Sequence, residues 1–297
     1  MNIRTILCPL DLSDTSRHAL EHAAAIARWY SARIIALHVH KALAGAPATV
    51  GAGLRATDDG LGIADFLPEL DDAVRTARGG NLEVDAEVVD GSQTASIIAD
   101  YAKQSPVDLI VMGTHGLSGF RHLVLGSVTE TVIRLASCPV LAVPPRAHSV
   151  SSLPFKRLLW PTDFSSSSLA ALELAFSFAQ EAGANITLMH VVDEAEEKAL
   201  FVARPYDIHE HARLADQRAS EQLLRLVPDT VRDWASPVVR LARGVPAEEI
   251  LHVAEDERTD LIMMGVQGRK PLDLMVFGST TNQVVRRARC PVLTVRR

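Results

Sequence analysis

The sequence is poor in several features that mark common classes of protein. Its three cysteines, Cys8, Cys138 and Cys290, include no Cys-x-x-Cys pair, so neither a disulfide framework nor a zinc site is predicted. No apolar run reaches the roughly 18 residues that a membrane-spanning helix needs, and the opening residues do not form a secretory signal. We therefore expect a cytoplasmic protein with reduced thiols and no membrane contact.

The sequence also lacks an excess of basic residues and a P-loop. Its 297 residues carry a formal charge of −6 with histidine neutral, which argues against nucleic-acid binding because that function needs a basic surface. A small anion in a local pocket is still compatible with this charge. No Gly-Lys-Ser or Gly-Lys-Thr segment is present, so a P-loop nucleoside triphosphatase is not predicted.

The sequence does contain an internal repeat. Ile3–Ser13 returns as Phe155–Ser165, and Val107–Gly113 returns as Thr259–Gly265, each 152 residues later. A Gly-Ser pair and a Cys-Pro-Val-Leu segment recur at the same offset. Matches at separated points with one spacing indicate a duplicated domain. The proline- and serine-rich stretch 144–154 is typical of a linker, which predicts domains at 1–146 and 153–297.

Strands and helices alternate in the same order in both halves. The first half has short β-branched runs and longer periodic runs, which predict strands near 3–8, 33–39, 82–89, 108–112 and 139–143 and helices near 15–30, 64–78, 93–104 and 127–136. This alternation predicts an α/β fold, with two tandem doubly wound domains whose parallel sheets have helices on both faces. Ligands of such sheets bind beyond the carboxyl ends of the strands at the switch point, here between the first and fourth strands.

Two glycine-rich turns follow the fourth strand in each half. Gly113-Thr-His-Gly116 precedes Gly126-Ser127 by nine residues, and Gly265-Val-Gln-Gly268 precedes Gly278-Ser279 by the same number. Glycine lets the main chain approach a ligand closely, and the free amides at a helix start bind anions. The alternative is that these glycines only turn the chain and begin a helix. The spacers between the two glycine turns have equal length but unlike sequences in the two halves, and this favours a ligand site that both halves share.

The first strand of each half ends in Pro-x-Asp, as Pro9–Asp11 and Pro161–Asp163. A carboxylate at this edge can accept a hydrogen bond from the amino group of adenine. The alternative role is helix capping, which aspartate performs well. Ser13 and Ser165 are also candidate caps, and capping by serine would leave the carboxylates freer for a ligand.

The second strand of each half ends in His-Val, as His38-Val39 and His190-Val191. A single histidine at a strand end is more often packed or solvated than metal-bound, so no metal site is predicted. The valines offer backbone groups to a base. The segments that follow, near 41–62 and 193–209, differ most between the halves and are either lids and partner surfaces or plain surface connections.

These motifs together resemble the universal stress protein family, twice over nearly the whole chain, and the glycine pattern resembles its ATP-binding branch. The resemblance implies five-stranded parallel sheets of order 3-2-1-4-5 and ATP, with or without Mg²⁺, in each half. The site implied in the first half consists of Pro9, Asp11, Val39, Gly113, His115, Gly116, Gly126, Ser127 and Val128. The site implied in the second half consists of Pro161, Asp163, Val191, Gly265, Gln267, Gly268, Gly278, Ser279 and Thr280.

The resemblance also implies an assembly and a function. The last strands, Pro139–Val143 and Pro291–Val295, would pair within one chain and cover two sheet edges, and two chains would form a homodimer. The implied function is an ATP-binding regulator of the stress response. No nucleophile paired with a general base is evident, so no catalytic residue is predicted. Two alternatives stay open: an ATP-dependent enzyme, either a slow ATPase or a transferase, that uses the same pockets, and an interaction scaffold without nucleotide.

Overall fold

The computed structural model describes residues 2–40, 63–77, 82–116, 125–147, 155–193, 208–232, 236–268 and 277–296. The chain divides into two compact units, Asn2–Leu153 and Pro154–Arg297. The predicted lid segment 41–62, most of 193–209 and the middle of both glycine spacers lie outside the described residues. None of the described helices combines the length and hydropathy needed to cross a bilayer.

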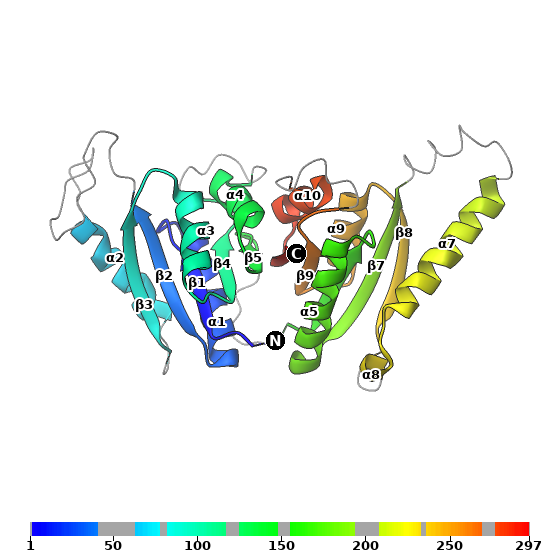
Figure 1. Cartoon of the computed structure of the whole chain (residues 1–297), viewed down its shortest axis with the longest axis horizontal. Helices are drawn as coiled ribbons and strands as arrows, with labels where there is room; N and C mark the ends of the chain where they lie inside the picture. The colour runs from blue at the N-terminus through cyan, green and yellow to red at the C-terminus, as the bar shows by residue number, and fades with distance from the viewer. Residues whose placement is uncertain are drawn as a thin grey trace. The chain divides into compact units, whose positions relative to one another are not determined.

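The first unit is a five-stranded parallel sheet with helices on its two faces (Figure 1). Its strands are β1 Thr5–Pro9, β2 Arg33–His40, β3 Val84–Asp90, β4 Leu109–Gly113 and β5 Val140–Val143, and its helices are α1 Asp14–Tyr30, α2 Ile63–Ala77, α3 Thr94–Gln104 and α4 Ser127–Leu135. The strand order is β3-β2-β1-β4-β5, and all four pairings are parallel. The predicted order 3-2-1-4-5 is confirmed.

The second unit has the same topology. Its strands are β6 Arg157–Thr162, β7 Asn185–Asp193, β8 Val238–Gly244, β9 Leu261–Gly265 and β10 Val292–Val295, and its helices are α5 Ser166–Ala182, α7 Ile208–Arg225, α8 Asp229–Arg232, α9 Pro246–Asp256 and α10 Ser279–Arg287. The order is β8-β7-β6-β9-β10 with parallel pairings throughout. The predicted fold of two similar doubly wound repeats is therefore confirmed.

The core of each unit lies between the sheet and the helices that cover its two faces. In the first unit, α1 contacts α2 and α3 contacts α4, which gives two helix pairs. All five residues of β1 are buried, as a central parallel strand requires. In the second unit, Trp160 on β6 is completely buried, and its indole N–H donates to the Ser168 carbonyl at 2.9 Å. A buried indole needs such a partner, and this bond fixes the start of α5 beside β6.

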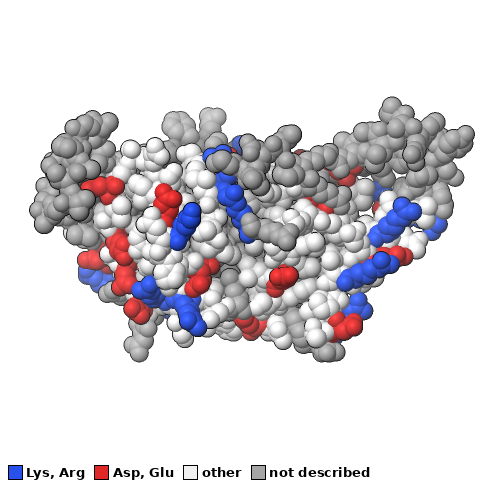
Figure 2. All heavy atoms as spheres, viewed as in Figure 1, with Lys and Arg blue, Asp and Glu red and all other residues white. Residues whose placement is uncertain are grey.

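Charged side chains of both signs lie on the surface. On the face shown in Figure 2, Lys and Arg are interspersed with Asp and Glu. Among the residues drawn in colour on that face, the two signs are mixed and form no extended basic area, whereas broad nucleic-acid binding requires a basic surface.

Candidate functional site

The turn after the first strand of each repeat has an unusual backbone. Leu12, between β1 and α1, has φ 66°, and Phe164, between β6 and α5, has φ 61°. Large side chains rarely adopt left-handed backbone angles, and such strain persists only where surrounding contacts hold it. Each of these residues directly follows the predicted ligand-binding aspartate. Strained residues gather at binding sites, so both turns are candidates for one.

Serine caps the helix after each turn, as predicted. Oγ of Ser13 and Oγ of Ser165 each accept a hydrogen bond from the amide three residues further on, at 3.2 Å. The carboxylates are nevertheless engaged. Oδ1 of Asp11 accepts from the amide of Ser13 at 3.1 Å and from its hydroxyl at 2.6 Å, while Oδ1 of Asp163 accepts from the amide of Ser165 at 3.0 Å. Serine is thus the cap, as predicted, and one oxygen of each carboxylate is taken up by the cap residue.

The other carboxylate oxygen lies against the glycine turn that follows the fourth strand. A Cβ atom placed on Gly116 would come within 2.5 Å of Oδ2 of Asp11. In the second repeat, a Cβ atom on Gly268 would come within 2.9 Å of Oδ2 of Asp163. The carboxylate and the glycine turn therefore meet at the same edge of the sheet in both repeats, and neither glycine could carry a side chain without moving the aspartate.

The first glycine of each turn has a different neighbour. A Cβ atom on Gly113 would lie 2.8 Å from Cγ2 and 3.1 Å from the carbonyl oxygen of Thr15, in the first turn of α1. On Gly265 it would collide with Ser167, in the first turn of α5. The close approach that requires glycine at these two positions is made by the protein's own helix, which is sufficient reason for glycine there.

The helices that follow the spacers begin without side-chain caps. Gly126 is the N-cap of α4 and Gly278 is the N-cap of α10. Their amides donate to the carbonyls of Thr114 and Val266, at 2.8 and 3.0 Å. The first hydrogen bond within α4 comes from the amide of residue 130, so the amides of residues 127–129 have no acceptor inside the helix. These amides and the positive end of the helix dipole favour an anion.

A threonine that the sequence analysis missed ties each helix to its glycine turn. Oγ1 of Thr129 donates to the carbonyl of Gly113 at 2.7 Å, and Oγ1 of Thr281 donates to the carbonyl of Gly265 at 2.9 Å. This bond holds the start of the helix over the end of the fourth strand. The sequence does contain a sign of this role, because both helices begin with the same order, Gly-Ser-x-Thr.

His38 and His190 lie within β2 and β7, which extend beyond the predicted His-Val ends, and both histidines hold the aspartate turns. Nδ1 of His38 lies 2.8 Å from the carbonyl oxygen of Leu10, and Nδ1 of His190 lies 2.7 Å from that of Thr162. A carbonyl oxygen only accepts, so Nδ1 carries the hydrogen in both rings. Each carbonyl belongs to the residue just before the aspartate. The sequence left open whether these histidines are packed or solvated. They are packed, and they also position the turn that carries the aspartate.

The remaining predicted residues lie around these turns. Pro9 and Pro161 are buried within their strands, Val39, Val191, Val128 and Thr280 are half-buried, and Ser127 and Ser279 are exposed at the first helical position. Among the described residues, no group of three or more His, Cys, Asp or Glu side chains has the arrangement of a metal site.

The two repeats differ at the centre of the glycine turn. In the first, Nδ1 of His115 lies 2.8 Å from Oγ1 of Thr114. In the second, the main chain of Gln267 is tied to α5, because its amide donates to Oγ of Ser167 and its carbonyl accepts from Oγ of Ser165, both at 3.3 Å. The second turn is thus held by the start of α5, and the first by a side chain of its own.

The cysteines add no reactive nucleophile. Burial raises the pKa of Cys138 to about 11 and that of Cys290 to about 12, and it raises the pKa of Cys8 further still. All three are free thiols. Because the thiolate is the nucleophilic form, these side chains are inert near neutral pH.

The chain matches known proteins along nearly its whole length. The sequence model of the universal stress protein family matches twice, over residues 2–144 and 154–296. A universal stress protein of Methanocaldococcus jannaschii is 33% identical over 149 residues, which cover 48% of this chain and 83% of that protein. The solved structure of a universal stress protein from Archaeoglobus fulgidus covers 100% of both chains with a TM-score of 0.67 and 22% identity, a likeness of fold. A universal stress protein solved in complex with cAMP is 26% identical and covers 50% of this chain and 99% of its own, with a TM-score of 0.38.

Proposed function

Because the chain belongs to the universal stress protein family, with one family domain in each half, we propose that it is a stress-response regulator that binds ATP at two similar sites. The observation that carries this proposal is a constellation that occurs twice. In each repeat a strand-end carboxylate meets a glycine turn, and an uncapped helix begins beside the same turn. Two copies of one arrangement are difficult to explain by chain turning alone.

Each part of the constellation fits one part of ATP. The amino group of adenine would donate to Asp11 or Asp163, and main-chain groups near Val39 and Val191 would bind the base. The phosphates would accept from the helix amides and from the exposed hydroxyl of Ser127 or of Ser279. If Mg²⁺ accompanies ATP, it would be held chiefly by the phosphates and water, as is usual for this ion.

Titration calorimetry of the purified protein with ATP, with and without Mg²⁺, tests this function. We expect two sites per chain in the wild type, one in Gly126→Val, one in Gly278→Val and none in the double variant. A valine at either position is crowded by a carbonyl oxygen, which lies 3.2 Å from a Cβ atom placed on Gly126 and 3.1 Å from one placed on Gly278. Each single variant is the control for the other repeat. Unchanged binding in the double variant would contradict the site.

The same preparation separates binding from catalysis. An ATP-dependent enzyme that uses these pockets, whether a slow ATPase or a transferase, would release phosphate or modify a second substrate over multiple turnovers. A regulator without catalysis would keep its nucleotide unchanged over the same period. Pairing of the repeats through their last strands, formation of a homodimer and a cytoplasmic location stay predictions.

A further inference from the structure

A chain of buried hydroxyl groups lies beside the aspartate turn of the second repeat. Oγ1 of Thr162 accepts a hydrogen bond from the amide of Phe164 at 2.8 Å and lies 2.9 Å from Oγ of Ser168. The hydroxyl of Ser168 donates to the carbonyl of Ser165 at 2.9 Å, so the hydrogen between Thr162 and Ser168 comes from Thr162. These bonds hold Phe164, whose backbone is left-handed and which follows Asp163.

The chain of hydroxyl groups continues to the glycine turn. Oγ of Ser165 lies 3.3 Å from both Oγ of Ser168 and the carbonyl oxygen of Gln267. Oγ of Ser167 accepts from the amide of Gln267 at 3.3 Å and donates to the carbonyl of Val295 on β10 at 3.4 Å. Hydroxyl groups thus connect the aspartate turn, the glycine turn and the last strand of the second repeat. The hydroxyl network, as we call it, consists of Thr162, Ser165, Ser167 and Ser168.

The first repeat has an apolar residue at the start of this network. Leu10 occupies the position of Thr162 and is buried. The counterpart of Phe164 is Leu12, which has the same left-handed backbone. Leucine has no oxygen that could accept from the amide of Leu12. The strained turn of the second repeat is therefore held by a side-chain hydrogen bond that Leu10 cannot supply in the first.

The link to the glycine turn also differs in the first repeat. Thr15 occupies the position of Ser167, and its methyl carbon Cγ2 lies 2.8 Å from a Cβ atom placed on Gly113. The hydroxyl of Ser13 donates to Oδ1 of Asp11 at 2.6 Å, whereas its counterpart in the second repeat reaches the glycine turn. A hydroxyl has one hydrogen, so the hydrogen of Ser13 is used within the aspartate turn.

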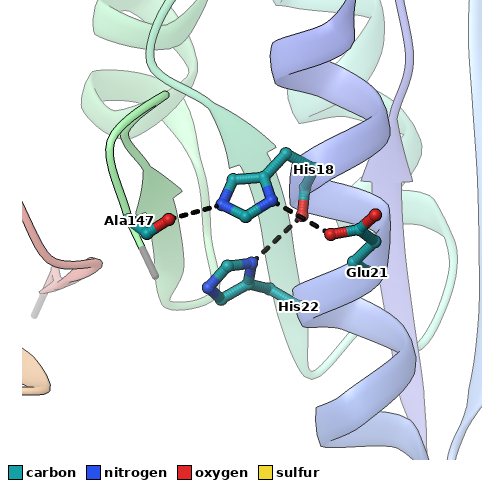
Figure 3. Close-up of polar contacts among 4 residues, drawn as sticks. All are labelled: His18, Glu21, His22 and Ala147. Atoms are coloured by element: carbon teal, nitrogen blue, oxygen red, sulfur yellow. Dashed lines mark hydrogen bonds and ion pairs between the residues drawn. The ribbon is translucent and has the colours of Figure 1, made fainter. Parts of the chain in front are cut away.

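The polar contacts of α1 in Figure 3 lie further along the helix. Nε2 of His18 lies 3.0 Å from the carbonyl oxygen of Ala147, and Nδ1 of His22 lies 3.0 Å from the carbonyl oxygen of His18. Ala147 lies four residues beyond β5, so this contact fixes α1 to the end of the repeat and involves neither turn of the site. In the second repeat Ala170 and Leu174 replace the two histidines. The two helices are therefore anchored at different places.

We propose that the hydroxyl network makes the second repeat the higher-affinity nucleotide site of the chain, an inference that rests on the proposed binding of ATP. The aspartate and the glycine turn must keep their relative positions to contact one nucleotide together. A site that is already held in its bound arrangement loses less conformational entropy on binding. The network supplies this order in the second repeat, so ATP should occupy that repeat first and leave it more slowly.

Titration calorimetry with ATP measures the two affinities separately, because Gly126→Val retains the second site and Gly278→Val retains the first. We expect the dissociation constant of the second site to be roughly five- to tenfold lower, the effect of one hydrogen bond. In the Gly126→Val background, Thr162→Val replaces the hydroxyl by a methyl group and should remove most of this advantage. Thr162→Ser keeps the hydroxyl and should retain the advantage.

Two further measurements complete the test. His18→Gln in the Gly278→Val background changes a contact of α1 away from the site and should leave the affinity of the first site unchanged. In the protein without ATP, hydrogen exchange of the Phe164 amide, measured by NMR, should be roughly five- to tenfold faster in Thr162→Val, which tests the network without a nucleotide. Exchange of the Leu159 amide in β6 reports whether each variant is folded.

The outcomes separate this inference from the function on which it rests. Equal affinities of the two sites, or a second-site affinity that Thr162→Val leaves unchanged, overturn the inference and keep the proposed function. Absence of ATP binding at both sites overturns the proposed function and the inference with it.

Discussion

Replacement of His38 by leucine tests how the aspartate turn is held. Leucine fills the buried position with a side chain of similar size but lacks the N–H of the imidazole, whose Nδ1 lies 2.8 Å from the carbonyl oxygen of Leu10. Leu10 is 3% exposed, and a buried acceptor that loses its donor costs about 1–3 kcal/mol. At about 2–4 °C per kcal/mol for a unit of this size, the melting temperature of the first repeat should fall by roughly 2–12 °C.

Calorimetric unfolding measures this change, and His38→Asn is the matched comparison because its side-chain amide retains a donor. We expect Asn to recover part of the loss. The affinity of the first site for ATP, measured with the second site blocked by Gly278→Val, should also fall about tenfold, because the peptide before Asp11 loses its anchor. If His38→Leu melts and binds nucleotide as the wild type does, the imidazole does not position the turn.

Three further changes address separate parts of the molecule. Gly116→Ala places a methyl group 2.5 Å from the present position of Oδ2 of Asp11, so we expect about tenfold weaker ATP binding with the fold intact; equal affinity in calorimetry would count against the site. Thr129→Val removes the hydroxyl that donates to the Gly113 carbonyl and should cost about 1 kcal/mol in urea unfolding, whereas no loss would show that this bond is dispensable. Burial lowers the pKa of His22 to about 4 in the folded protein, against about 6.5 in the unfolded chain. The unfolded chain therefore binds more protons between these pH values, and the stability of the folded protein falls as the pH drops through them. His22→Leu should reduce this loss of stability in acid; pH profiles of the melting temperature that run parallel for the variant and the wild type would refute the expectation.

The fold could be predicted because each signal occurs twice. The predicted first helix, 15–30, is observed as Asp14–Tyr30, and the predicted fourth strand, 108–112, is observed as Leu109–Gly113. The meeting of Asp11 with Gly116 was also within reach of the sequence, since the carboxyl ends of neighbouring parallel strands share one edge of the sheet. Backbone topology alone determines these features.

Side-chain geometry determines the features that could not be predicted. Which oxygen of Asp11 the cap residue Ser13 engages depends on rotamers, and the reason for glycine at Gly113 depends on how closely α1 packs. The bonds made by His38 and Thr129 were missed because a histidine or threonine in a repeat is compatible with many roles. The recurrence of these residues at equal offsets in the two repeats indicated that they share a role, but it did not indicate which atoms they contact.

Native mass spectrometry of the purified protein is the decisive measurement for two-site nucleotide binding, because it counts the nucleotides that each chain carries. After equilibration with millimolar ATP, we expect two added adenine nucleotides per chain, one in each repeat. A chain that takes up none under these conditions does not bind ATP as proposed, however well its fold matches the family.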